Sequence, residues 1–504
     1  MTNRADNRLA QLITAGQREQ RRGDFSQALA YFNQGLALAR ELDDPDGIAA
    51  SLNQRGEIYH QRGELAQALA DYEQALAQAE GVGNRGAQVR ALNGLGEVNH
   101  VWDKFERAQG YYEQAQAVAE GAGDQAGLAR SLRNQGEIQH GRGKLAQAWG
   151  YYEQSLSRAE AAGDSLLQAR CLNSLARAHK DRGEMAQARL AHEQALAMAE
   201  MLGDQTALVE CWTYLGLVDK SQGNLTQAQR RYEQALSLAE KIGLKGQQGA
   251  LLNNLGQMAQ QGGDFRGALV HYQQAQAIFE ALGATSSWAG VLSNIGLIYQ
   301  SQGARPQALT AYEQALEMVQ KTGLRAQTAL LLNNIGQCYH QQGELARALT
   351  YYEQALTVAQ EIGSEGLRGL CLVNMGQVYQ QQRDLSQSLA AYEEALAIFS
   401  ALGDKAKIAV TLNNLGGVYQ AKQDFSQAQA YYEQALTLDR ELGHQAGVAR
   451  ELLNLGALYV MQGNPATAEP LLAEAVSLLQ ALRSPYLAQA QAWLERAVGN
   501  KADS

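Results

Sequence analysis

The sequence predicts an all-α fold, a superhelical solenoid of twelve helix-turn-helix units that ends in a C-terminal capping helix. Three observations support this prediction. A 40-residue pattern recurs from residue 11 to residue 490 without insertion or deletion. Each repeat carries apolar residues at helical spacing. Glycines and small residues return at fixed places within it. Such a repeat indicates a solenoid, in which each unit is stabilised by stacking on its neighbours.

The second repeat shows how each unit divides into two helices. Leu52, Gly56 and Tyr59 lie at i, i+4 and i+7, which places them on one apolar stripe of a helix. Ala68 and Tyr72 share one face of the following helix. Small residues let the two helix axes approach closely, and the aromatic ring fills the space beside them. The glycine that closes the second helix recurs as Gly83, Gly123, Gly163, Gly203 and onward to Gly443.

The residue after that closing glycine is often an aspartate, which indicates an N-cap for the next helix. The candidates are Asp124, Asp164, Asp204 and Asp404. At the chain ends the pattern changes. We expect residues 1–10 to form an N-terminal leader, and residues 11–490 to form one continuous solenoid without an internal domain boundary. Ser484 and Pro485 suit a helix start, so we expect a capping helix and tail over 485–504.

Composition narrows the classes of function. The 504 residues include 46% hydrophobic and 19% charged residues, which indicates a folded protein. A net charge of −10 without a long basic run argues against nucleic-acid and membrane-surface partners. No apolar stretch is long enough to span a membrane, and no secretion signal is recognisable. The cysteines show no metal-ligand spacing, so we expect buried thiols in a cytoplasmic protein: Cys171, Cys211, Cys338 and Cys371.

The unit resembles the tetratricopeptide repeat, whose pattern is W-x2-L-G-x2-Y, then A-x3-F, then P. In the unit at 291–330, these places are held by Ile295, Gly296, Tyr299, Ala308 and Tyr312, and another unit supplies the tryptophan as Trp212. The family proline is replaced by Glu80, Glu120 and Glu160, and the second helix is longer. This lengthened form is similar to the repeats of Pins-type adaptors and kinesin light chains. The resemblance implies a right-handed superhelix whose first helices line a concave groove.

The groove arc predicted on the first helices has two halves of different chemistry. The ionic half, in the second to fourth units, combines Glu57, His60, Arg90, Glu97, His100, Arg130, Glu137, His140 and Arg170. From residue 251 the corresponding arc carries amides, which we call the amide half: Asn253, Asn254, Asn294, Asn333, Asn334, Asn374, Asn413, Asn414, Asn454, Gln257, Gln337 and Gln377, with Gln300, Gln380 and Gln420 beside them.

An amide side chain offers both a donor and an acceptor. A stack of amides can therefore hydrogen-bond the backbone of an extended peptide with little regard to its sequence, and the resemblance implies such ladders. The alternative is that these residues are merely soluble ones copied by duplication. Because the arc faces solvent in this interpretation, we expect Ala substitutions at Asn294, Asn334, Asn374 and Asn414 to leave the fold intact.

The repeated Glu-x-x-His spacing permits a metal site in helical bundles. Here the motifs lie on successive parallel helices on the order of 10 Å apart, so we expect no metal and no cofactor, and interpret the motif as a polar surface that responds to pH through its histidines. His192 lies at the aromatic position and is expected to be a packing residue. No nucleophile, phosphate loop or paired carboxylate is recognisable, so the sequence predicts a protein that is not an enzyme.

Three functions remain open from the sequence. The first is a monomeric scaffold that binds an extended or helical peptide segment of another protein along the groove. The second is a regulatory sensor whose superhelix changes pitch when a peptide or small ligand binds. The third is a structural array that self-associates through its convex face.

Overall fold

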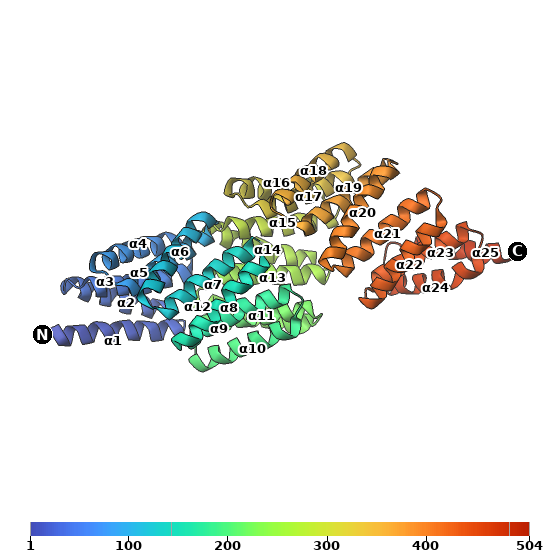
Figure 1. Cartoon of the computed structure of the whole chain (residues 1–504). Helices are drawn as coiled ribbons and strands as arrows, with labels where there is room; N and C mark the ends of the chain where they lie inside the picture. Colours follow the sequence, from blue (N-terminus) through green and yellow to red (C-terminus); the bar gives the residue numbers. More distant parts are fainter. Residues whose placement is uncertain (1, 143, 483, 503–504) are drawn as a thin grey trace. The chain divides into compact units, whose positions relative to one another are not determined.

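The computed structural model describes residues 2–142, 144–482 and 484–502, with side chains for 7–142, 144–482 and 484–499. These residues are almost entirely helical and include no strand, which confirms the predicted all-α fold of helix pairs (Figure 1). The chain divides into two compact units, which we call unit 1 (Met1–Leu324) and unit 2 (Arg325–Ser504).

The helices of unit 1 are α1 (Thr2–Arg21), α2 (Phe25–Glu41), α3 (Pro45–Arg62), α4 (Leu65–Val82), α5 (Arg85–Val101), α6 (Phe105–Ala122), α7 (Gln125–Gly141), α8 (Leu145–Ala162), α9 (Ser165–Asp181), α10 (Met185–Leu202), α11 (Gln205–Ser221), α12 (Leu225–Ile242), α13 (Lys245–Gln261), α14 (Phe265–Leu282), α15 (Thr285–Ser301) and α16 (Arg305–Thr322).

The helices of unit 2 are α17 (Arg325–Gln341), α18 (Leu345–Glu361), α19 (Glu365–Gln381), α20 (Leu385–Leu402), α21 (Lys405–Ala421), α22 (Phe425–Glu441), α23 (Gln445–Met461), α24 (Pro465–Ala481) and α25 (Leu487–Ala502). From α1 to α23, each odd-numbered helix packs most extensively on the even-numbered helix that follows it.

Helix ends follow the predicted chemistry. At the end of α4, Gly83 takes a left-handed φ of 74°, and Asn84 N–H donates to Ala79 O at 2.9 Å. This hydrogen-bond pattern is a Schellman cap, which satisfies carbonyls that the helix leaves free. The predicted N-caps are confirmed: the side chains of Asp124, Asp164, Asp204 and Asp404 each accept a backbone N–H of the helix that they precede.

Most helix pairs are held at a fixed separation by a glycine that lies against an aromatic ring. Tyr312 is fully buried, and a Cβ placed on Gly296 would lie 2.5 Å from its Cε1 atom. Where the glycine is replaced, by Ala176, the tyrosine is replaced too, by His192. His192 is buried as expected, stacks on Tyr214 with ring centroids 5.3 Å apart, and lies 2.8 Å from Asn173 Oδ1. The smaller imidazole makes room for the extra methyl group.

The odd-numbered helices form the inner layer of each unit. Successive odd-numbered helices approach one another directly, from α1 to α15 in unit 1 and from α17 to α25 in unit 2. The even-numbered helices mainly contact their odd-numbered neighbours. In a curved array of two layers, the layer whose members lie closer together is on the inside of the curve. The odd-numbered helices therefore line the concave face, as the resemblance implied.

In unit 1 the array curves far enough to contact itself, because α13 packs against α3. Phe25 and Ile58 share one apolar cluster with Ile242 and Leu244, some two hundred residues away along the chain. We call this contact between the first turns of unit 1 and the region around α13 and α15 the seam. The helices from α3 to α13 thus surround an interior lined by the ionic half.

The two ends of the chain are helical. α1 begins at Thr2, so residues 2–10, which were expected to form a leader, belong to the first helix, and Leu9 is buried. At the other end α25 packs on α23 and α24, where Ala490 and Ala497 are fully buried. Met1 and residues 503–504 lie outside the described residues. The expectation of one continuous solenoid stays a prediction.

The glycine contact generates the first prediction, for two glycines of the same helix. We expect Gly296→Ala to destabilise the protein by about 1–2 kcal/mol, since overpacking against Tyr312 outweighs the better helix propensity of alanine. Gly290→Ala is the matched control, because a Cβ there meets nothing within 4 Å. It should stabilise the fold slightly. Guanidinium unfolding midpoints measure both effects.

The natural pair of Ala176 and His192 supplies a rescue. Adding Tyr312→His to Gly296→Ala should recover part of the lost stability. Equal midpoints for Gly296→Ala and Gly290→Ala would contradict the contact argument.

Candidate binding groove

Glu137 is the centre of the best-connected cluster on the inner face. It projects from α7, and two side chains of α9 hold it: Arg177 Nη1 donates to Oε2 and Ser174 Oγ donates to Oε1, both at 2.8 Å. Burial by itself would raise the pKa of Glu137, but the charge of Arg177, the charge of Arg133 and these hydrogen bonds lower the pKa to about 2. Glu137 is therefore ionised and fixed.

The histidines of the ionic half have different surroundings. His140 Nε2 lies 2.7 Å from Asp181 Oδ2, and its other ring nitrogen lies 3.4 Å from Arg177 Nη2. His100 packs edge-to-face on Phe105, and its pKa is lowered, chiefly by burial. His60 is half-buried. The three imidazoles occupy equivalent repeat positions and do not converge on one centre.

Glu57 and Glu97 complete the acidic side of the ionic half. Asn134 Nδ2 donates to Glu97 Oε1 at 3.1 Å. Burial opposes ionisation of Glu97, yet His60, Arg130 and other neighbours hold its pKa below the usual value. Glu57 is half-buried and forms no hydrogen bond or ion pair with any described residue. These carboxylates act on the guanidiniums around them through space.

Three arginines at one repeat position form a row along the inner face. Arg90, Arg130 and Arg170 project from α5, α7 and α9, and none forms a hydrogen bond or ion pair within the described residues. Burial, then the charge of Arg130, lowers the pKa of Arg90, so neighbouring members repel one another. Burial would also lower the pKa of Arg170, but Glu210 and Glu57 raise it. Because Glu57 belongs to α3, this interaction acts across the enclosed interior.

The amide half is arranged as pairs between neighbouring odd-numbered helices. Asn294 Nδ2 donates to Asn253 Oδ1 at 2.9 Å, and Asn374 Nδ2 donates to Asn333 Oδ1 at 2.8 Å. The same bond joins Asn454 to Asn413 at 2.7 Å. The partners lie 41 residues apart, so each pair joins one 40-residue repeat to the next. The asparagine amides that were expected to bind a peptide therefore form some of their hydrogen bonds within the protein.

This pairing corrects the expectation that the four alanine sites are exposed. Asn334 and Asn374 are both only 8% exposed, and Asn294 and Asn414 are half-buried. The next odd-numbered helix covers these positions, which an isolated helical wheel assigns to solvent. Asn333 is buried as well, whereas Asn253, Asn254, Asn413 and Asn454 are half-buried. Substituting all four alanine sites would therefore disturb the fold.

The glutamines beside this half have two different roles. Gln260, Gln300 and Gln420 accept the hydroxyl groups of the core tyrosines of their own units at 2.8–3.0 Å, as Tyr272, Tyr312 and Tyr432 show. Gln380 lies 3.5 Å from Tyr392 Oη in the same arrangement. In contrast, Gln337 and Gln377 are half-buried and form no hydrogen bond within the described residues, while Gln257 accepts from Lys220 at 2.8 Å.

A tetratricopeptide repeat family model matches residues 47–121, 88–161, 127–201, 208–281, 289–361, 367–441 and 407–481. The chain belongs to the tetratricopeptide repeat family. No curated protein matches it. Arrays of this kind present extended concave surfaces for binding, and the family is generally one of interaction scaffolds and not of enzymes. This tetratricopeptide chain is accordingly a protein-interaction scaffold.

Solved structures of similar architecture include the Rap protein complexed with Competence and Sporulation Factor, 14% identical over 72% of this chain and 99% of that one, with a TM-score of 0.53. BtubC from P. vanneervenii is 26% identical over 44% of this chain and 92% of its own, with a TM-score of 0.39. A STAND protein with a tetratricopeptide repeat sensor from Pyrococcus horikoshii is 14% identical over 70% of this chain and 54% of its own, with a TM-score of 0.45. The Rap likeness shows the fold.

Sequence reasoning missed two features of this tetratricopeptide groove. The first is Arg177, which occupies the same position as Glu137 in the next 40-residue repeat. Such a charge reversal between consecutive repeats is the signal that could have revealed their ion pair. The second is a row of aliphatic residues in unit 2, where Leu330, Leu370 and Val410 hold the repeat position of the three arginines. Leu330 is 39% exposed, and the other two are half-buried.

The two inner faces consequently differ in charge. On α17, α19 and α21, the repeat positions equivalent to Arg90, Asn93, Gly94, Glu97, His100 and Val101 contain His340 but no Asp, Glu, Lys or Arg, whereas on α5, α7 and α9 these positions are rich in charged residues.

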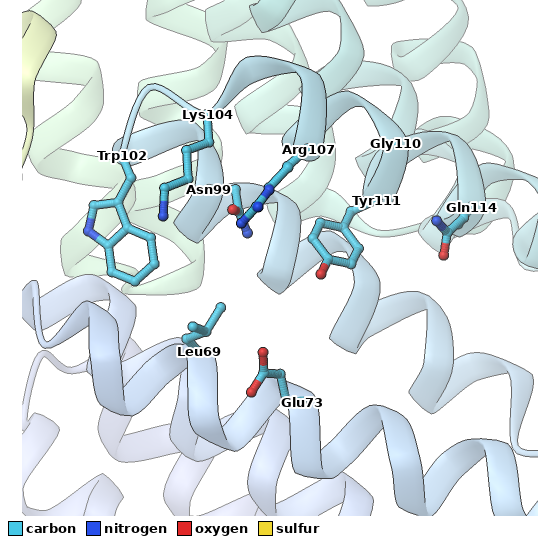
Figure 2. Close-up of a pocket in the computed structure, with 9 residues that line it drawn as sticks. All are labelled: Leu69, Glu73, Asn99, Trp102, Lys104, Arg107, Gly110, Tyr111 and Gln114. Carbon is cyan, nitrogen blue, oxygen red and sulfur yellow. The ribbon is translucent and has the colours of Figure 1, made fainter. Parts of the chain in front are cut away.

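The even-numbered side of the tetratricopeptide array also has a hollow of about 400 Å³ beside α4 and α6 (Figure 2). Trp102, Lys104, Arg107, Tyr111 and Glu73 line it together with Leu69, Asn99, Gly110 and Gln114.

In the parts of the chain that the structure describes, no group of three or more His, Cys, Asp and Glu side chains is placed to hold a metal ion. The four cysteines are free thiols and buried, as expected. Among the helices described, none combines the length and apolarity that crossing a membrane requires.

The amide pairs generate a prediction on stability. Asn374→Ala removes the donor to Asn333 Oδ1 and leaves a buried acceptor without its partner. We expect a loss of about 1–3 kcal/mol, the typical cost of an unsatisfied buried polar group. Gln354→Ala, at an exposed position of α18, is the control and should change stability by less than about 0.5 kcal/mol. Chemical unfolding of both variants decides the matter, and equal midpoints would show that the pair does not stabilise the array.

The lowered pKa of Glu137 predicts how stability depends on pH. Because its pKa falls from 4.5 to about 2 on folding, Glu137 contributes stability above pH 4.5 that is lost as the pH falls toward 2. The contribution is at most about 3 kcal/mol. We expect the unfolding midpoint of the wild type to fall more steeply over this range than that of Glu137→Gln. If the unfolding midpoints of the two proteins fall equally with pH, Glu137 does not contribute to the loss of stability in acid.

Proposed function

We propose that this protein is a non-enzymatic scaffold that binds an extended or helical segment of a partner protein along the inner face of its odd-numbered helices. One observation carries the proposal. Arg90, Arg130, Arg170, Gln337 and Gln377 lie on this face, and none has a hydrogen-bond or ion-pair partner among the described residues. Groups that join helices, such as Asn374 and Arg177, do have partners.

The chemistry of the two faces supports two kinds of bound segment. A guanidinium presents donors in a planar fork that matches a carboxylate, so the arginine row in unit 1 suits an acidic segment. In unit 2 the free amides suit a peptide backbone, and Leu330 with its aliphatic neighbours suits apolar side chains. The uncharged face of α17, α19 and α21 favours a segment without formal charge. The Rap protein, solved as a complex, agrees with a ligand-binding role for this architecture.

A sensor is the second candidate, and the seam of unit 1 favours it. A partner that enters the enclosed interior between α3 and α13 has to pass an end of that interior or separate the seam. Binding would then change the curvature of unit 1. Small-angle scattering distinguishes the candidates, because a sensor changes its radius of gyration when a partner binds and a rigid scaffold does not. The monomeric state, the cytoplasmic location and the absence of nucleic-acid partners stay predictions.

The experiment uses affinity capture followed by binding measurements on the captured partner. One variant carries Arg90→Ala, Arg130→Ala and Arg170→Ala, and another carries Gln337→Ala and Gln377→Ala. Segments of each captured protein are synthesised, and their affinity is measured by fluorescence anisotropy. We expect at least one variant to weaken binding of its segment by about tenfold or more, since these residues supply charged or bidentate hydrogen bonds.

Matched controls lie on the outer helices. Arg107→Ala, Arg230→Ala and Arg266→Ala remove three exposed guanidiniums from α6, α12 and α14, and Gln314→Ala with Gln354→Ala removes two exposed amides. They should retain wild-type affinity. If the outer variants lose binding and the inner variants keep it, partners bind the convex face and the proposal fails.

A further inference from the structure

The turn between α5 and α6 departs from the pattern that most of the corresponding turns follow. Most corresponding turn positions are glycines with left-handed φ angles: Gly23, Gly63, Gly183, Gly223, Gly263, Gly303, Gly343 and Gly463. In this turn the position is Asp103, with φ 57°. Side chains disfavour this conformation. Arg383 and Gln423 also adopt it, but they are exposed, whereas Asp103 is 8% exposed. Asp103 therefore has a structural role that a glycine could not perform.

That role is a hydrogen bond across the seam. Asp103 Oδ2 accepts the backbone N–H of Ser286 at 2.7 Å, although the two residues are 183 positions apart. Ser286 is the second residue of α15, and the N-cap of this helix, Ala284, makes no side-chain cap. Asp103 thus supplies a cap that α15 lacks locally. A carboxylate is favoured there by the positive end of the helix dipole.

The neighbouring turns join the same seam by close apolar contact. A Cβ on Gly63 would lie 2.2 Å from Leu282 Cδ2, and a Cβ on Gly23 would lie 2.4 Å from Ile242 Cγ2. Ile242 and Leu244 are buried, although Leu402, at the repeat position of Ile242, is 52% exposed. Gly23 and Gly63, which keep the glycine of their turns, thus lie directly against aliphatic side chains on the other side of the seam.

The closed state also carries a cost. Burial raises the pKa of Asp103 to about 6, and the Ser286 N–H only partly opposes that rise. The carboxylate is thus ionised at neutral pH while it is largely removed from water, which favours the open state at pH 7 relative to acidic pH. This desolvation makes the contact releasable, while the cap and the apolar contacts hold it closed.

We propose that the turn at Asp103 is a latch that closes unit 1 into a ring, and that its release opens a lateral entrance to the arginine row inside. Latching is a property of the free protein and stands independently of any partner. The entrance rests on the proposed function, because it assumes that a partner binds Arg90, Arg130 and Arg170. A bound segment that needs the open state would stabilise it, and release of the latch would then regulate binding.

The test of the latch compares Asp103→Gly with Gln423→Gly in the full-length protein. Both changes restore the glycine that this turn prefers, but only the first removes a cap across the seam. Cysteines introduced at the exposed positions Ala66 in α4 and Ala281 in α14 carry spin labels on either side of the seam. The four native thiols are buried, so labelling is selective, and electron–electron double resonance gives the distance distribution.

We expect one short distance in the wild type and in Gln423→Gly. In Asp103→Gly a longer distance should appear, with the ratio of open to closed molecules raised by about tenfold, since a hydrogen bond to a charged group is lost. Asp103→Asn keeps an acceptor and tolerates the left-handed conformation, so it should give a smaller rise. An unchanged distribution in Asp103→Gly would overturn the latch.

A second measurement tests the entrance with a fluorescein-labelled poly-glutamate peptide as an acidic extended probe. Asp103→Gly should bind it with a faster association rate than the wild type, and Arg90→Ala, Arg130→Ala and Arg170→Ala should abolish binding in either background. An open seam with an unchanged association rate would overturn the entrance and leave the latch. Binding that survives loss of the three arginines would contradict the proposed function of unit 1, and the distance measurement would still decide the latch.

Discussion

The structure depends on the contact between a glycine of most odd-numbered helices and an aromatic ring of the next helix. A Cβ at Gly96, Gly256 or Gly416 would lie within 2.6 Å of a tyrosine carbon. The two helices can approach only because that atom is missing, and the buried ring fixes their separation. Because the same helix-pair geometry is repeated, the odd-numbered helices come together on the concave side of each array. A few side chains in each repeat then determine the chemistry of the groove.

In this array of near copies, several residues that break the pattern make tertiary contacts that the other copies lack. Ala176 is compensated by the smaller ring of His192, which packs on it from the next helix. Arg177 reverses a charge and pairs with Glu137 of the preceding unit. Asp103 gives up the glycine of its turn and caps α15, whose own cap position is Ala284. In each of these three cases the substitution is matched by a residue of another helix, whereas Arg383 and Gln423 replace a turn glycine at exposed positions.

The helix pairs, the aspartate caps and the buried thiols followed from the sequence, because each depends on neighbours within one unit or the next. The wheel of a single helix could not show that Asn374 lies against Asn333, since the covering helix comes from another repeat. Nor could it assign Gln300 to the hydroxyl of Tyr312, which requires the crossing geometry of the pair. The seam could not be predicted for a different reason. Whether Asp103 contacts α15 depends on the sum of the small rotations between all the repeats that separate them.

The unpaired arginines distinguish a binding surface from a merely stable one. A guanidinium in the partly enclosed interior of unit 1 loses hydration, and like charges on Arg90 and Arg130 repel. Stability alone would favour pairing each with a carboxylate, as Arg177 is paired with Glu137, or replacing it by an aliphatic residue, as Leu330 does at the same position in unit 2. In this row Glu210 and Glu57 raise the pKa of Arg170 without a direct hydrogen bond or ion pair. The guanidinium donors are therefore left for another group, and an anionic partner would supply the direct hydrogen bonds that the described residues do not.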